Sequence, residues 1–160
     1  GEVDGVSQSD PALTILQEKN LIKIMLDTRT MKGNQELFGG AFPAACLYAQ
    51  PELLTKTPGT AQALATGIVR ANEWLQKATP AEVAASVPEA YLLGDKAVYE
   101  KSFAGVRETI SPDGLMPAGA MENALKFLVD GDPKIAADAG KLKLADTWTN
   151  EFAQRAGKRS

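Results

Sequence analysis

The spacing of apolar and polar residues changes after residue 50. Before it, short apolar runs alternate with polar stretches, and Leu21–Asp27 is rich in branched aliphatic residues and bounded by polar ones. Such runs predict strands. We expect three, over residues 1–7, 21–27 and 41–49, with Pro43 marking the third as an edge or bent strand. A helix beginning at Asp10-Pro11 lies between the first two, so this part has the alternation typical of an α/β fold.

From Pro51 onward the spacing favours helices. Thr57-Pro58 begins a helix whose apolar positions recur every three or four residues, and Thr79-Pro80-Ala81-Glu82 has the pattern of a capping box at the start of another. Further helices are predicted over 95–109, 117–130 and 146–156, and the polar stretch 28–40 is expected to be mostly loop. The second part is therefore predicted to be helix-rich.

Composition narrows the classes of protein. The chain has 160 residues, of which 44% are hydrophobic and 23% charged, as in ordinary globular domains. Its net charge of −3 provides no broad basic surface, which argues against nucleic acid as a partner. No apolar stretch approaches the roughly 18 residues of a membrane span.

Candidate catalytic chemistry is sparse. With no histidine, neither a Ser/His/Asp nor a Cys/His device can be assembled within this chain. Cys46 lies among apolar residues and is predicted to be a buried small side chain. Asp113, Asp130 and Asp132 stand beside glycines but lack the ligand series of a calcium loop, so turns are expected there. We therefore expect no catalytic residues, no metal and no cofactor.

Two polar stretches are candidates for ligand binding. Ser7, Gln8, Ser9 and Asp10 lie between the end of the first predicted strand and the start of a helix. Sheets of α/β proteins bind ligands at such places, and a helix N-terminus favours anions. The alternative is that Ser9 and Asp10 only cap the helix. Thr28 and Arg29 follow the second predicted strand and are open to the same two interpretations.

Several segments together resemble a known family. They are Gly1–Gly5 followed by Asp10-Pro11, Leu21–Thr28, Pro58–Leu64, Thr79–Glu82, Ser111–Gly114 and Thr147–Phe152. In order and spacing they resemble the second lobe of ABC-importer solute-binding proteins of the nitrate/sulfonate/taurine type, a group also described as thiamine-pyrimidine-synthase-like. The resemblance covers essentially the whole chain.

The resemblance implies a partial periplasmic-binding-protein type II fold of the α/β class. Residues 1–50 would be the latter part of the second lobe with a crossing strand. Residues 51–160 would form a helical segment that packs mainly on a first lobe, which this chain lacks. The implied protein is periplasmic and not an enzyme. It captures a small anionic or heterocyclic solute between two lobes and delivers it to an ABC permease in the membrane.

The ligand residues carried over from the resemblance are those of the two loops. Hydroxyl and backbone N–H groups of Ser7, Gln8, Ser9 and Thr28 would orient the solute. Arg29 would pair with an anionic group, and Asp10 would hold the helix start or accept from a ligand amine.

Two alternatives stay open. One is a pyrimidine-synthase-like enzyme of the same fold, although the chemistry of that branch depends on a histidine and this chain has none. The other is a self-associating interaction fragment, in which unpaired strand edges at 3–7 and 41–49 would form a homodimer.

Overall fold

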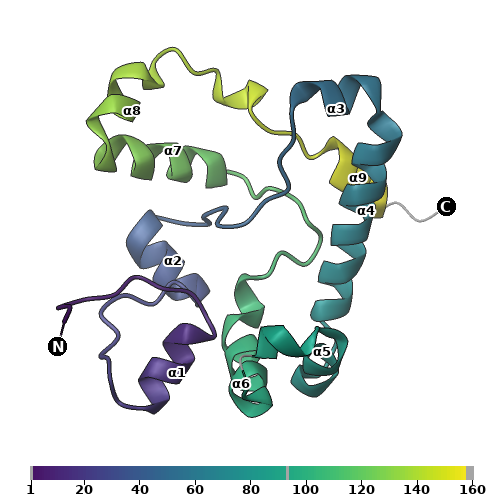
Figure 1. The fold of residues 1–160 in the computed structure, drawn as a ribbon. Coiled ribbons are helices and arrows are strands. Elements are labelled where there is room, and N and C mark those ends of the chain that lie inside the picture. The colour runs from purple at the N-terminus through teal and green to yellow at the C-terminus, as the bar shows by residue number, and fades with distance from the viewer. Residues whose placement is uncertain (1, 93, 158–160) are drawn as a thin grey trace.

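The computed structural model describes residues 2–92 and 94–157, and this part of the chain is helical (Figure 1). Its α-helices are α1 (Ala12–Glu18), α2 (Met31–Phe38), α3 (Pro51–Lys56), α4 (Pro58–Leu75), α5 (Pro80–Ser86), α6 (Lys96–Val106), α7 (Ala120–Gly131), α8 (Pro133–Ala139) and α9 (Glu151–Gly157). Three short 3₁₀ helices are η1 (Glu89–Leu92), η2 (Arg107–Thr109) and η3 (Leu144–Asp146).

The predicted α/β fold is wrong for the part of the chain that the structure describes. No strand is found at 2–7, 21–27 or 41–49, which run as irregular segments between helices, so neither a sheet nor strand edges are present among the described residues. A strand is stabilised by hydrogen bonds to a second strand, and these segments have no such partner here. Several of their apolar side chains are exposed to solvent as a result: Met25 is 87% exposed and Tyr48 is 89% exposed.

The helix termini explain where several helices begin. At α5 the Thr79 hydroxyl accepts from the backbone N–H of Glu82 at 3.2 Å, and the Glu82 carboxylate accepts from the backbone N–H of Thr79 at 2.7 Å. This is the predicted capping box. The start of α4 at Pro58 is also confirmed. The predicted loop at 28–40 is wrong in part, because Thr30 caps α2 by accepting from the backbone N–H of Gly33.

The helices pack in pairs rather than around one large core. In Figure 1, α4 lies against α9 and α3, α5 against α6, and α7 against α8. The buried cluster of Ala78, Val83 and Phe103 lies at the α5/α6 contact, with Leu75, Tyr99 and Ile110 packed against it. Contacts of α1 with α6 and of α2 with α7 cross residue 50. The division into 1–50 and 51–160 stays a prediction.

An aromatic cluster joins α2 to α7. Phe38 stacks on Phe42 with ring centroids 3.9 Å apart, and Phe127 meets both rings edge-on at 5.1 and 5.6 Å. The side-chain amide of Asn123 donates to the carbonyl of Ala41 at 3.1 Å beside them. These contacts hold the segment after α2 against α7.

The molecule exposes much more surface than a compact chain of its size. Its accessible area is 11423 Å², whereas the size scaling of folded monomers gives about 7,700 Å² for its 17.0 kDa. Cys46, predicted to be buried, is exposed. Among the described helices, none combines the length and apolar character needed to cross a bilayer.

Candidate functional site

Asp10, Thr14, Gln17, Asp27 and Arg29 form a hydrogen-bonded group that we term the Arg29 cluster. Nε and Nη2 of Arg29 donate to the two carboxylate oxygens of Asp27 at 2.8 and 2.7 Å. Nη1 donates to Asp10 Oδ2 at 3.3 Å, and Nη2 also donates to Gln17 Oε1 at 3.3 Å. The guanidinium therefore connects the loop after residue 26 to Gln17 of α1 and to Asp10, which lies two residues before α1.

The Asp10 carboxylate organises the first turn of α1. Its Oδ1 accepts from the backbone N–H of Thr14 at 2.9 Å and from the Thr14 hydroxyl at 2.7 Å. The N-cap position itself is Pro11, one residue later than predicted for the cap. The Asp10 side chain is only 7% exposed, so these donors and Arg29 replace the water that an exposed carboxylate would contact.

The loop that carries Arg29 is held by its own hydrogen bonds. The backbone N–H of Arg29 donates to Asp27 Oδ1 at 3.0 Å. The buried side chain of Asn34 donates to the carbonyls of Thr28 and Thr30, both at 2.9 Å. The backbone of Gly33 approaches the carbonyl of Asp27 so closely that a Cβ atom at Gly33 would lie 1.6 Å from that oxygen. The loop is therefore clamped onto the start of α2.

The charges of the cluster do not balance. The bidentate hydrogen bond from Arg29 lowers the pKa of the Asp27 carboxyl below its ordinary value of 3.8, although partial burial opposes the shift. The same bond raises the pKa of Arg29, against partial burial, so the guanidinium stays charged. Two carboxylates thus face one guanidinium, which gives the cluster a formal charge of −1. Of the five N–H groups of the guanidinium, the four bonds above engage four.

The structure brings the two predicted loops together through the contact of Asp10 with Arg29. Ser7, Gln8, Ser9 and Thr28 are exposed next to that contact in sequence. Gln8 Oε1 accepts from the backbone N–H of Ser9 at 3.1 Å. Among the described residues, the hydroxyls of Ser7, Ser9 and Thr28 have no hydrogen-bond partner, which leaves them available to a ligand.

Sequence reasoning missed three members of the cluster. Asp27 ends the apolar run that precedes Thr28, and its spacing of two residues from Arg29 could have suggested a local ion pair. Thr14 and Gln17 follow Asp10 by four and seven residues, which places all three on one side of the α1 turn.

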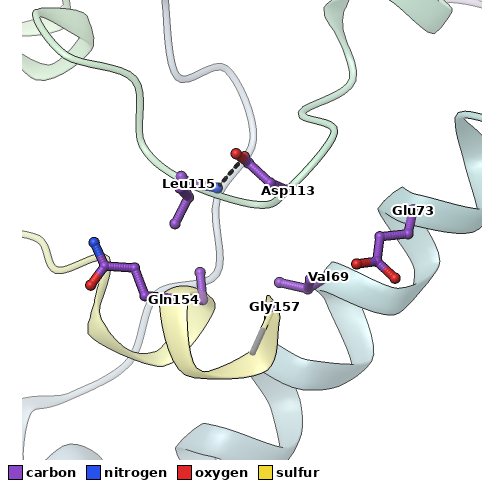
Figure 2. Close-up of a pocket in the computed structure, with 7 residues that line it drawn as sticks. Val69, Glu73, Asp113, Leu115, Gln154 and Gly157 are labelled. Atoms are coloured by element: carbon purple, nitrogen blue, oxygen red, sulfur yellow. Dashed lines mark hydrogen bonds between the residues drawn. The ribbon is translucent and has the colours of Figure 1, made fainter. Parts of the chain in front are cut away.

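A hollow lies away from the Arg29 cluster, between α4, α9 and the turn around residue 113 (Figure 2). It has a volume of about 470 Å³ and is lined by Val69, Glu73, Asp113, Leu115, Ala153, Gln154 and Gly157. The Asp113 carboxylate accepts from the backbone N–H of Leu115 at 3.0 Å and so belongs to the predicted turn. In the described ranges no group of three or more candidate side chains could hold a metal ion.

Comparisons with known proteins identify one similar structure. The chain resembles a solved protein structure from Bordetella bronchiseptica RB50 with a TM-score of 0.87 and 46% sequence identity, over 92% of this chain and 46% of the Bordetella chain. This chain therefore spans about half the length of the protein it matches. No family model matches, and no curated protein matches either.

Proposed function

We propose that this chain is part of the solute-binding component of an ABC importer, a periplasmic protein without catalytic activity that captures a small molecule and delivers it to a membrane permease. The observation that carries the proposal is the meeting of the loops 7–10 and 28–29 through Asp10 and Arg29, with unpartnered hydroxyls beside it. The order of the segments that resemble this family supports it. The proposal rests on these residues and not on a sheet.

The charges of the Arg29 cluster favour a solute that donates hydrogen bonds over an anion. A sulfonate or nitrate needs several donors, and the engaged guanidinium has one N–H left. A net negative cluster also repels an anion. A heterocycle with amine or ring N–H groups can donate to the carboxylate of Asp27, whose side chain is 34% exposed, and its ring nitrogens can accept from the hydroxyls. Of the two solute classes, we therefore choose the heterocycle.

The exposed hydroxyls would orient such a ring. Hydroxyl groups both donate and accept, so Ser7, Ser9 and Thr28 suit the mixed edge of a heterocycle. The hydrogen bonds of the Arg29 cluster would fix the positions of the two loops. A binding site gains affinity when its groups are ordered before the ligand arrives.

Titration of the isotope-labelled chain with 4-aminopyrimidine, followed by backbone amide NMR shifts, tests the proposal. We expect saturable shifts centred on residues 7–10 and 28–30, and weaker shifts or none there with taurine. The variant Thr28→Val removes one hydroxyl and should weaken binding about fivefold, a typical loss for one hydrogen bond. Thr60→Val, which removes another exposed hydroxyl in α4, is the matched control and should bind unchanged.

Two outcomes contradict the proposal. Saturable shifts confined to other residues would move the binding site away from the loops. No saturable shifts at the solubility limit of the probe would mean that these loops are not a solute site. Stronger binding of taurine than of the pyrimidine would retain the site but reverse the choice of solute.

A further inference from the structure

Helix α4 has two apolar faces, and the chain uses one of them. Val69, only 3% exposed, and Ala61 belong to the buried face. This face meets α9, where the Gln62 side chain donates to the carbonyl of Phe152 at 2.9 Å. The opposite face carries exposed, uncharged residues spaced three or four apart, one of which, Leu64, is 47% exposed. We term it the α4 stripe: Thr60, Leu64, Gly67, Ile68, Ala71 and Trp74.

The stripe has the pattern of a helix-packing face. Its spacing keeps the six residues on one side of the helix over 14 positions, or roughly 21 Å. Gly67 and Ala71 at its centre are small, and a Cβ atom at Gly67 would meet nothing within 4 Å. Small residues at a crossing point let a second backbone approach closely. The stripe therefore has the form of a contact surface for another element, and its six residues are exposed in the described structure.

The excess accessible surface of the chain indicates how large a partner of the α4 stripe could be. The accessible area of 11423 Å² exceeds the size-scaling value by about 3,700 Å². A standard interface buries about 800 Å² on each partner, so one two-fold contact with a second copy would cover a minor part of this excess. A partner that covers more than about 800 Å² of this chain accounts for the excess surface better than a second copy does.

The comparison with the Bordetella structure supplies a candidate of that size. At a TM-score of 0.87 the matched part of that protein has the same arrangement as this chain, and more than half of the Bordetella chain lies outside the match. We propose that the α4 stripe docks on an apolar face of a second structural unit equivalent to that unmatched part. The inference is independent of the proposed solute. Because the stripe has no charged residue, the contact is dominated by burial of apolar surface.

Co-expression of this chain with the unmatched part of the Bordetella protein tests the docking. We expect a 1:1 complex by light scattering coupled to gel filtration. In a Trp148→Phe background Trp74 is the remaining tryptophan, and its emission should shift to shorter wavelength in the complex because docking removes its ring from water. Amide exchange along α4 should slow at the same time.

Two substitutions in the stripe and one matched control identify the surface. Gly67→Leu places a side chain in open space in the free chain but blocks close approach of a partner, and Leu64→Asp puts a charge into the apolar contact. Each should weaken the complex by at least about tenfold. Gly105→Leu makes the same change as Gly67→Leu at an exposed position of α6 that also has open space, and should leave the complex intact.

Three outcomes overturn the inference. One is the absence of any complex between the two polypeptides. Another is a complex that tolerates Gly67→Leu and Leu64→Asp as well as it tolerates Gly105→Leu. The third is a homodimer of this chain alone that Gly67→Leu dissociates, which would assign the stripe to a second copy.

Discussion

Replacement of Gly33 by alanine should destabilise the protein, although the same change at most helical glycines stabilises. Gly33 lies in the first turn of α2, where an added Cβ would be 1.6 Å from the carbonyl oxygen of Asp27 and 2.7 Å from its carbonyl carbon. An ordinary contact needs about 3.4 Å, so backbone must move by roughly 1.5 Å or more. The atom that must move belongs to the residue that holds Arg29.

The magnitude follows from three opposing terms. Overpacking against a backbone atom costs about 1–3 kcal/mol, and displacing Asp27 weakens its bidentate bond with Arg29 at a further cost of about 1–2 kcal/mol. The higher helix propensity of alanine stabilises the helix by about 1 kcal/mol relative to glycine. The net loss in the free energy of unfolding is therefore about 1–4 kcal/mol, and a loss at the middle of that range, about 2.5 kcal/mol, lowers the Tm of a chain of this length by about 5–10 °C.

Thermal and urea unfolding followed by far-ultraviolet circular dichroism measures this loss. Gly67→Ala is the matched control, because its Cβ meets nothing within 4 Å and α4 is helical there. We expect it to stabilise by about 0.5–1 kcal/mol. Opposite signs for the two variants would support the close approach at Gly33. A Gly33→Ala protein as stable as Gly67→Ala would refute it and, with it, the clamp on the Arg29 loop.

The remaining predictions concern charges and caps. Arg29→Lys loses the bidentate hydrogen bond to Asp27 and should lower the free energy of unfolding in urea by about 1–2 kcal/mol. Lys32→Ala breaks an exposed ion pair with Glu36 and should change that free energy by less than about 0.5 kcal/mol. Because the pKa of Asp27 is lowered in the folded state, its contribution to the free energy of unfolding is fully present above the unfolded pKa near 3.8. That contribution is lost as the pH falls through the lower folded pKa. Asp27→Asn should therefore lose less stability than the wild type when unfolding is measured across this pH range. Thr79→Ala should destabilise by about 1 kcal/mol in thermal unfolding by opening the capping box, and an unchanged Tm would count against it.

Helix starts could be predicted from the sequence where the signal is local. Thr79 and Glu82 are three residues apart and satisfy each other's backbone, so no distant contact is needed to place α5. Pro58 begins α4 for a similar reason, since its ring fits the first turn. The helix Pro133–Ala139 was not predicted, because the turn residues Asp132-Pro133 indicate equally well an end or a beginning.

The strands could not be predicted correctly because a strand depends on distant residues. The runs at 2–7, 21–27 and 41–49 have the composition of strands, but hydrogen bonding to a neighbouring strand decides whether one forms. Val3, Leu21, Met25 and Tyr48 are all largely exposed in these segments. Composition identified the segments that carry apolar side chains, and the missing partner left those side chains in water.

The candidate site shows the same division between local and distant information. Ser7 to Asp10 and Thr28 to Arg29 were selected because they flank predicted strands. Asp10 and Arg29 nevertheless meet at 3.3 Å, although the described residues of those segments form no strand. What joins them is charge: a nearly buried carboxylate needs a cation, and Arg29 is placed to supply one through the loop clamped at Gly33. Because Asp27 accepts hydrogen bonds from Nε and Nη2 of the same guanidinium, few N–H donors of Arg29 remain for an anion. The residue that first suggested an anionic solute is therefore the strongest physical reason to expect one that donates hydrogen bonds.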